Sequence, residues 1–449
     1  MPSAQHDECQ FLPTANSTPA HRPTLFAKTR TREAHGDFQG GFTAASAEHG
    51  RFVWKRFAVC FMLGFCVSAD ICAVEIFDKF QIHGFASQVM FSTSHNNMFG
   101  HSEEAPSFDF TELGLNGSWF PLPKLRFSMQ VLSRRAGAGH NGSPEIDFGL
   151  MDYSPIETDA YRLGLRGGRV RLPYGIYNDT RDVAFTRPSI LLPQSIYFER
   201  TRDLTLSADG GLLYGESRNT WGNVTLEMGG VVLRANDDID NKLAVLGRNG
   251  AGHLDSDLSF VGRLNYELND GSMRLAVSSV DTAINYIPQS YIDPLLPGKF
   301  LFTPVIFSAQ YSTEDLTFTS EYAIRPIKKH GFAASQNLDI VGESYYFQVA
   351  YRLADHWEIM ARYDNLTSNR NDPNGQKIQA STFGAVPAYT QFAKDWTVGM
   401  RYDISSWMMV RAEYHKVNGT GWLPPQDNPV RAEQIQHWDM LAVLVSLRF

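Results

Sequence analysis

The sequence predicts an all-β protein: a single antiparallel up-and-down barrel of about sixteen strands that crosses a membrane, with about eighteen as the alternative count. Three observations predict this fold. From residue 80 onward, apolar residues alternate with small, polar or charged residues in one segment after another. The links between these segments alternate between short and long, and a stretch with the features of an export signal precedes them.

Composition excludes several classes of protein. The chain has 449 residues, is 43% hydrophobic and 12% aromatic, and carries a net charge of -8. The apolar content excludes general disorder, and the acidic balance argues against nucleic-acid binding, which needs a basic face. All four cysteines (Cys9, Cys60, Cys66, Cys72) precede residue 74, so disulfides, thiolate metal sites and cysteine nucleophiles are not expected beyond it.

Residues 51–73 have the pattern of a signal peptide. A basic start precedes an apolar run too short to span a bilayer as a helix, and small residues place the cleavage after Ala69 or Ala73. Residues 1–50 are polar and lack a hydrophobic period. We expect them to be a non-native or disordered extension, with translation starting near Val53.

The segments that follow have period two, and each is typical of one strand. In 396–404, for example, Trp396, Val398 and Met400 alternate with Thr397 and Gly399. In chain order we expect strands at 80–91, 107–119, 125–134, 145–153, 161–172, 201–218, 223–233, 258–268, 272–283, 300–312, 316–325, 343–352, 357–367, 393–404, 407–418 and 437–449.

Alternation also occurs in soluble β-sandwiches, so the two faces must be compared. The apolar parity carries aromatic residues near the segment ends, such as Trp119, Trp357, Trp396 and Trp438, as the interfacial girdles of a membrane barrel require. The other parity carries Arg, Glu, Asp and Gln, which a sandwich core could not bury unpaired. Only a closed barrel satisfies its backbone in lipid while hiding polar side chains inside. These features favour a membrane barrel.

The chain ends in WDMLAVLVSLRF, which resembles the last strand of Gram-negative outer-membrane proteins. The residues that carry this likeness are Trp438, Leu441, Val443, Val445, Leu447 and Phe449. With the export signal and the alternating links, residues 74–449 resemble the bacterial outer-membrane porins. The resemblance implies contact with outer-membrane lipid and lipopolysaccharide, folding by the barrel-assembly machinery, periplasmic short turns, extracellular long loops and, as in many porins, a homotrimer.

The connection 173–203 is the longest and holds three prolines. It is too apolar, with Ile190, Leu191 and Phe198 among others, for a purely solvated loop. In porins the third long loop folds inward and narrows the channel, so the resemblance predicts the same here. The alternative is an ordinary cap over the barrel mouth.

Charged residues near this loop are the candidates for ion selectivity. Arg162 and Arg166 share one parity, whereas Arg169 and Arg171 share the other, which predicts a β-bulge at the intervening glycine pair. The wall and loop candidates are Arg126, Arg134, Arg162, Arg166, Arg169, Arg171, Asp179, Arg181, Asp182, Arg187, Glu199, Arg200, Arg202 and Asp203. Arginines that face loop charges of both signs favour small polar or anionic solutes. The net negative charge of the chain points the other way, so the preference for anions or cations stays open.

The function that the resemblance implies is passive diffusion of small hydrophilic solutes and ions. Diffusion needs no cofactor, metal or catalytic residue, and none is expected. The aspartates near 237–257 fit a solvated loop better than a cation site. The alternatives are a substrate-specific channel with a binding site in its throat and, third, an outer-membrane hydrolase, although we find no defensible Ser/His pairing.

Overall fold

The computed structural model describes residues 74–77, 79–290, 293–332 and 337–449. The expected signal peptide, the N-terminal extension and all four cysteines lie outside these ranges. Within them, nineteen strands form one sheet. No helix among the described residues is long and apolar enough to cross a bilayer.

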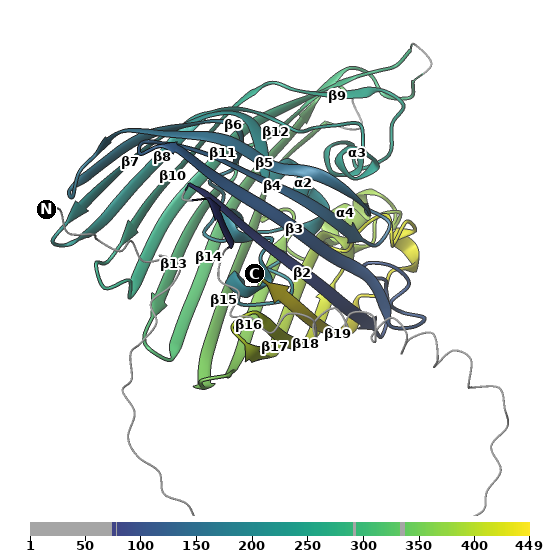
Figure 1. Cartoon of the computed structure of the whole chain (residues 1–449). Coiled ribbons are helices and arrows are strands. Elements are labelled where there is room, and N and C mark those ends of the chain that lie inside the picture. Colours follow the sequence, from purple (N-terminus) through teal and green to yellow (C-terminus); the bar gives the residue numbers. More distant parts are fainter. Residues whose placement is uncertain (1–73, 78, 291–292, 333–336) are drawn as a thin grey trace, which may run out of the picture. The chain divides into compact units, whose positions relative to one another are not determined.

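Sixteen of these strands each pair antiparallel with two neighbours, and β19 pairs with β2, so the barrel is closed (Figure 1). They are β2 (Phe80–Thr93), β3 (Ser107–Leu122), β4 (Leu125–Ala136), β5 (His140–Glu157), β6 (Tyr161–Arg171), β7 (Ser207–Asn219), β8 (Gly222–Leu233), β10 (Leu258–Glu267), β11 (Met273–Ile287), β13 (Val305–Ser312), β14 (Leu316–His330), β15 (Leu338–Ala354), β16 (Trp357–Thr367), β17 (Phe392–Ser405), β18 (Met408–Gly419) and β19 (His437–Arg448). The sixteen-strand prediction is confirmed.

The other three strands are short and add to the ends of the barrel wall. β1 (Val74–Phe77) pairs with the start of β2, while β9 (His253–Ser256) pairs with β11 beside β10. β12 (Gly298–Phe302) lies between β11 and β14 and leads into β13. The barrel is therefore taller than the predicted segments, most clearly in β14 and β15.

The predicted alternation sets the two faces of the wall. In β4, the apolar side chains of Phe127 and Met129 are 39% and 51% exposed. The polar side chain of Gln130, the next residue, is 3% exposed. This is the reverse of a soluble protein, because the apolar side chains face outward and the polar ones are enclosed. An apolar exterior of this kind fits the hydrocarbon region of a bilayer.

The outer face also carries aromatic side chains, including Trp119, Trp357 and Trp396, which are exposed. Trp438, expected on the same face, lies inside instead. It is 2% exposed, its ring centroid lies 5.3 Å from that of Trp422, and its Nε1 donates to the carbonyl of Gly419 at 3.1 Å. The reason is its parity, because the even-numbered residues of β19 face inward.

The connections differ at the two ends of the barrel. One end has tight turns, such as 123–124 and 406–407, and the other has long links with α3 (Ile239–Leu246) and α4 (Gln376–Ser381), as Figure 1 shows. One link at this second end is short: β4 and β5 extend further than expected and meet at 137–139.

The expected strand start at 201 is wrong. Residues 199–205 form a 3-10 turn, η3 (Glu199–Thr201), followed by the helical turn α2 (Arg202–Thr205). Strand β7 begins only at Ser207, opposite Arg171. The helical turn is favoured because it buries Leu204 against a side-chain cluster that includes Val245.

Candidate functional site

The link between β6 and β7, which we call the inner loop (residues 172–206), is bonded to the inner face of the opposite wall. The backbone N–H of Gly175 donates to the Ser278 hydroxyl at 2.9 Å, and that of Ile176 donates to Glu321 Oε1 at 3.1 Å. Ser278 and Glu321 are inward-facing and buried. The loop therefore reaches across the interior.

A second set of contacts holds the loop further along. The N–H groups of Ile190 and Ser195 donate to Glu413 Oε1 at 2.6 Å and Asp364 Oδ2 at 3.2 Å. Arg362 donates in return to the carbonyl of Leu191 at 3.0 Å. Strands β16 and β18 thus supply both acceptors and donors to backbone that would otherwise be buried unsatisfied.

The apolar residues of the loop explain why it is not solvated. They pack into two clusters with inward-facing wall residues. One cluster contains Ala184, Phe185, Ile190, Leu191 and Phe198 from the loop, and the other contains Leu172, Tyr174, Ile176, Tyr177, Leu192, Ile196 and Tyr197. Burial of these side chains contributes about 1.5–3 kcal/mol for each large one.

At the middle of the interior, loop and wall meet in what we call the central network: Glu112, Arg134, Arg181, Arg187 and Glu199. Arg134 Nη2 lies 2.5 Å from Glu199 Oε2, and its Nε lies 3.3 Å from Glu112 Oε1. Arg181 Nη2 is 2.9 Å from Glu199 Oε1, and Arg187 Nη2 is 3.5 Å from Glu112 Oε2. Three arginines thus surround two carboxylates.

The central network fixes the charge of Glu199. Burial alone would raise the pKa of this carboxyl, but Arg181 and Arg134 outweigh it and lower the pKa to about 2. Glu199 is therefore ionised at neutral pH, and it holds the loop to the wall through Arg134.

The start and end of the inner loop are tied together by a further cluster. Arg171 forms ion pairs with Asp147 and Asp182, and Arg202 pairs with Asp182. The side-chain amide of Gln130 donates to both carboxylates at 3.0 Å. These residues anchor the base of the loop.

Arg126, Arg162 and Arg166 form an accessible basic strip on the inner wall, with side chains 40%, 34% and 30% exposed. Arg126 Nη2 and Arg166 Nε both contact Asp152 Oδ2, at 3.0 and 3.3 Å, and Arg166 Nη1 lies 3.0 Å from Glu227. They are the inward-facing wall candidates that remain open to solvent, and Asp179 of the inner loop, with its side chain 41% exposed, is open as well.

A buried arginine that the sequence reasoning missed lies beside the strip. Arg263 on β10 pairs with Glu227 at 2.6 Å and with Asp179 of the inner loop at 2.7 Å. Its position next to Arg166 follows from the pairing of β8 with both β7 and β10. Only its inward parity could have indicated it from the sequence.

Arg169 does not lie with the strip. Strand β6 pairs with β5 and β7 without a register shift at the glycine pair, so the expected bulge there is wrong. The register shift lies on β5, between Tyr153 and Ile156, nearer the start of β6. Arg169 therefore stays on the parity of the exposed Leu163. It pairs with Asp209, directly opposite on β7, at 2.8 Å.

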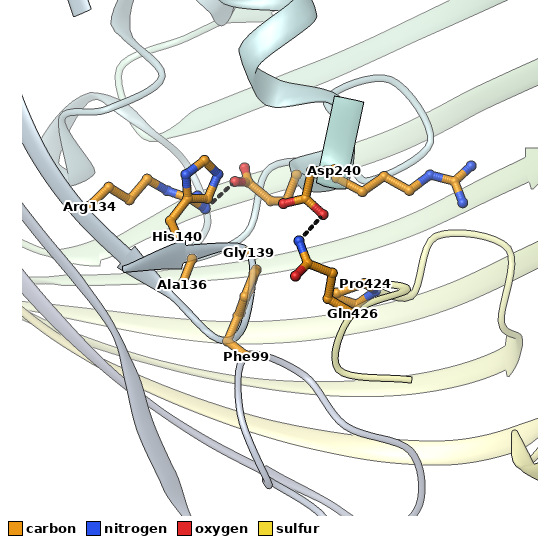
Figure 2. A pocket seen from close by; sticks show the side chains of 10 residues that line it. Phe99, Arg134, Ala136, Gly139, His140, Asp240, Pro424 and Gln426 are labelled. Atoms are coloured by element: carbon orange, nitrogen blue, oxygen red, sulfur yellow. Dashed lines mark hydrogen bonds and ion pairs between the residues drawn. The ribbon is translucent and has the colours of Figure 1, made fainter. Parts of the chain in front are cut away.

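Arg200 and Asp203 lie at the end of the inner loop. Arg200 lines a small open cavity of about 20 Å³ together with Phe99, Arg134, His140 and Asp240, as Figure 2 shows for the labelled residues. Neither Arg200 nor Asp203 has an ion pair within the described part of the chain. The cavity faces the end of the barrel with the long links.

One buried set resembles hydrolase chemistry. His415 Nδ1 lies 2.8 Å from Asp395 Oδ2 and 3.1 Å from the Thr397 hydroxyl. All three side chains are buried in the interior, where they face the inner loop rather than an accessible cleft. No group of three metal-binding side chains occurs among the described residues.

A comparison with known protein families gives no match. An uncharacterized protein of Aquifex aeolicus (strain VF5) is 23% identical over 288 residues, which cover 58% of this chain and 62% of that protein. The chain therefore spans less than two thirds of this relative.

Solved structures give a clearer likeness. The outer membrane channel DcaP of Acinetobacter baumannii has a TM-score of 0.52 at 9% identity, covering 84% of this chain and 100% of that one. OmpF of Salmonella typhi, in complex with daunomycin, has a TM-score of 0.50 at 13% identity with the same coverage. OmpT of Vibrio cholerae, expressed in the outer membrane, has a TM-score of 0.50 at 11% identity and covers 84% of this chain. The chain has the fold of the porin and channel barrels of the bacterial outer membrane.

Proposed function

We propose that this protein is an outer-membrane porin through which small hydrophilic solutes and ions diffuse passively, with the inner loop as its constriction. The observation that carries the proposal is a closed sixteen-strand barrel with an apolar exterior and a charged interior. A barrel of this size has room for an aqueous path. The long links are then extracellular and the tight turns periplasmic.

The basic strip and the inner loop together supply the selectivity. Arg126, Arg162 and Arg166 face the interior from one wall, and Asp179 of the loop pairs with Arg263 beside this strip. Fixed charges of both signs across a narrow opening create a transverse field that orders solutes by charge and dipole. Diffusion through such an opening uses no catalytic residue.

A second candidate is a substrate-specific channel. The burial of the inner loop favours this candidate. Its residues 189–199 are all buried. A loop held this closely leaves less room than a general pore needs, so a solute would have to bind in the opening in order to pass.

Planar-bilayer recording tests both candidates. Stable ohmic steps that saturate only weakly with solute support the general porin, whereas block by one solute at micromolar concentration supports the specific channel. A purified protein that inserts but never conducts contradicts the porin. Lipase and protease assays on the same preparation test the hydrolase alternative.

The last strand is proposed as the assembly signal. Leu441, Val443, Val445 and Leu447 share the outward parity, and the ring of Phe449 lies over Gly84, where a Cβ atom would come within 2.3 Å of it. We expect deletion of Phe449 to slow assembly by the barrel machinery in cells, measured as loss of folded protein from the outer membrane. A homotrimer is proposed from the resemblance alone, and native mass measurement tests it.

A further inference from the structure

Two arginines meet at one aromatic ring beside the constriction. The guanidinium carbons of Arg200, on the inner loop, and Arg325, on β14, lie 5.2 and 5.3 Å from the centroid of Phe198. A cation over an aromatic face is stabilised by about 0.5–2 kcal/mol. That contribution does not by itself offset the repulsion between two cations held this close together.

Neither arginine has a carboxylate partner within the described ranges. Arg325 is 5% exposed and donates through Nη2 to the carbonyl of Thr367 at 2.9 Å, while its Nε is buried without a partner. The Nε of Arg200 is likewise buried and unpartnered. Asp364 acts on Arg325 electrostatically but forms no ion pair with it; its Oδ2 accepts from the backbone N–H of Ser195, and its Oδ1 is buried without a partner.

The surroundings add positive charge rather than removing it. Burial, and then the neighbouring Arg431, lower the pKa of Arg200 to about 10. The acids that share the cavity of Figure 2 are engaged elsewhere, because Glu199 pairs with Arg134 and Arg181 and Asp240 accepts from Gln426. The cation cluster therefore lacks a counter-ion of its own.

We propose that Arg200 and Arg325 form a binding subsite for a solute that carries two or more carboxylate or phosphate groups. The planar donor fork of each arginine matches one such group, and their shared contact with the ring of Phe198 holds the two forks close together. The subsite lies on the long-link side of the inner loop, apart from the basic strip. This inference rests on the proposed channel and names the solute class that it would select.

The test measures block of ionic current by citrate, with acetate at equal ionic strength as the monovalent comparison. For the unaltered protein in planar bilayers we expect citrate, added to the side of the long links, to interrupt the current, and acetate to leave it unaffected. In Arg200→Gln and Arg325→Gln we expect the apparent Kd for citrate to rise about tenfold, since each change removes a charge-assisted contact.

Arg248→Gln is the matched control, because it removes one positive charge from an exposed position in a long link. We expect it to bind citrate as the unaltered protein does. A conducting channel in which citrate acts like acetate, or in which all three variants respond equally, overturns the subsite but not the porin. If the protein does not conduct, citrate titration of the detergent-solubilised protein by calorimetry decides the subsite alone. Should Arg325→Gln fail to fold, Arg200→Gln against Arg248→Gln still decides it.

Discussion

At the scale of single residues, the face on which an arginine lies decides its role. Arg166 and Arg169 are three positions apart on β6, yet one faces the interior and the other pairs with Asp209 on the outer parity. The sequence predicted the parity of Arg166 correctly. It failed for Arg169 because a glycine pair is compatible with a bulge as well as with a regular ladder.

Arg166→Ala should lower the anion-to-cation permeability ratio, because it removes an accessible positive charge from the interior while Asp152 and Glu227 remain. Reversal potentials in a salt gradient measure this. Arg169→Ala is the matched control and should leave the reversal potential unchanged. Equal shifts in the two variants would contradict the assignment of faces.

The central network should respond to acid. The pKa of Glu199 lies at about 2, below its ordinary value of 4.5, so its stabilisation of the loop is complete above pH 4.5 and is lost as the pH falls toward 2. This contribution is on the order of 3 kcal/mol. We expect single-channel conductance to rise over this window as the loop loosens.

Glu199→Gln should show the raised conductance already at neutral pH, since Arg134 and Arg181 lose their shared partner. Glu145→Gln, at an exposed ion pair with Arg234, is the control and should behave like the unaltered protein. A conductance independent of pH in every variant would remove Glu199 from the mechanism.

At the scale of elements, period two was sufficient to place all sixteen strands. The ends facing the long links were less predictable: β14 continues to His330 and β15 begins at Leu338, beyond the expected segments. These extensions bear Lys328 and Asp339, which pair at 3.6 Å. The alternation of apolar and polar residues weakens where the outer face no longer needs to be apolar.

Some glycines leave space for a large side chain of the neighbouring strand to lie flat against the inner wall. A Cβ at Gly164 would lie 2.4 Å from the Tyr214 hydroxyl oxygen, which donates to Asp152 at 2.7 Å. Gly164→Ala should displace Tyr214 and destabilise the barrel by about 1–3 kcal/mol, measured by thermal unfolding in detergent. Gly167→Ala, where a Cβ meets nothing within 4 Å, should be close to neutral. Equal losses in the two variants would contradict this packing.

At the scale of the whole molecule, the fold class could be predicted because lipid outside and water inside impose opposite demands on alternate residues. The site was predictable only in part. The apolar, proline-containing connection indicated a constriction, but its partners Glu112, Asp364 and Glu413 lie on strands far from it in sequence. One sequence cannot show which inward-facing residues a long loop will reach, since that depends on barrel closure.

Deleting residues 185–196 should increase conductance, because this stretch carries the contacts of the inner loop with Arg362, Glu413 and Asp364. The strands that hold the loop pair with one another without any loop residue. The barrel should therefore still form, and far-UV circular dichroism can check this. A folded variant with unchanged conductance would show that the loop does not limit the opening.

In this barrel, one face of each strand should meet lipid and the other should meet water. With the four cysteines that precede residue 74 replaced by serine, a single introduced cysteine reports on its own position. Ser128→Cys faces the interior and Met129→Cys faces outward on the same strand. After reconstitution in lipid, a membrane-impermeant thiol reagent should label position 128 and spare 129. Labelling of 129 with protection of 128 would contradict the account.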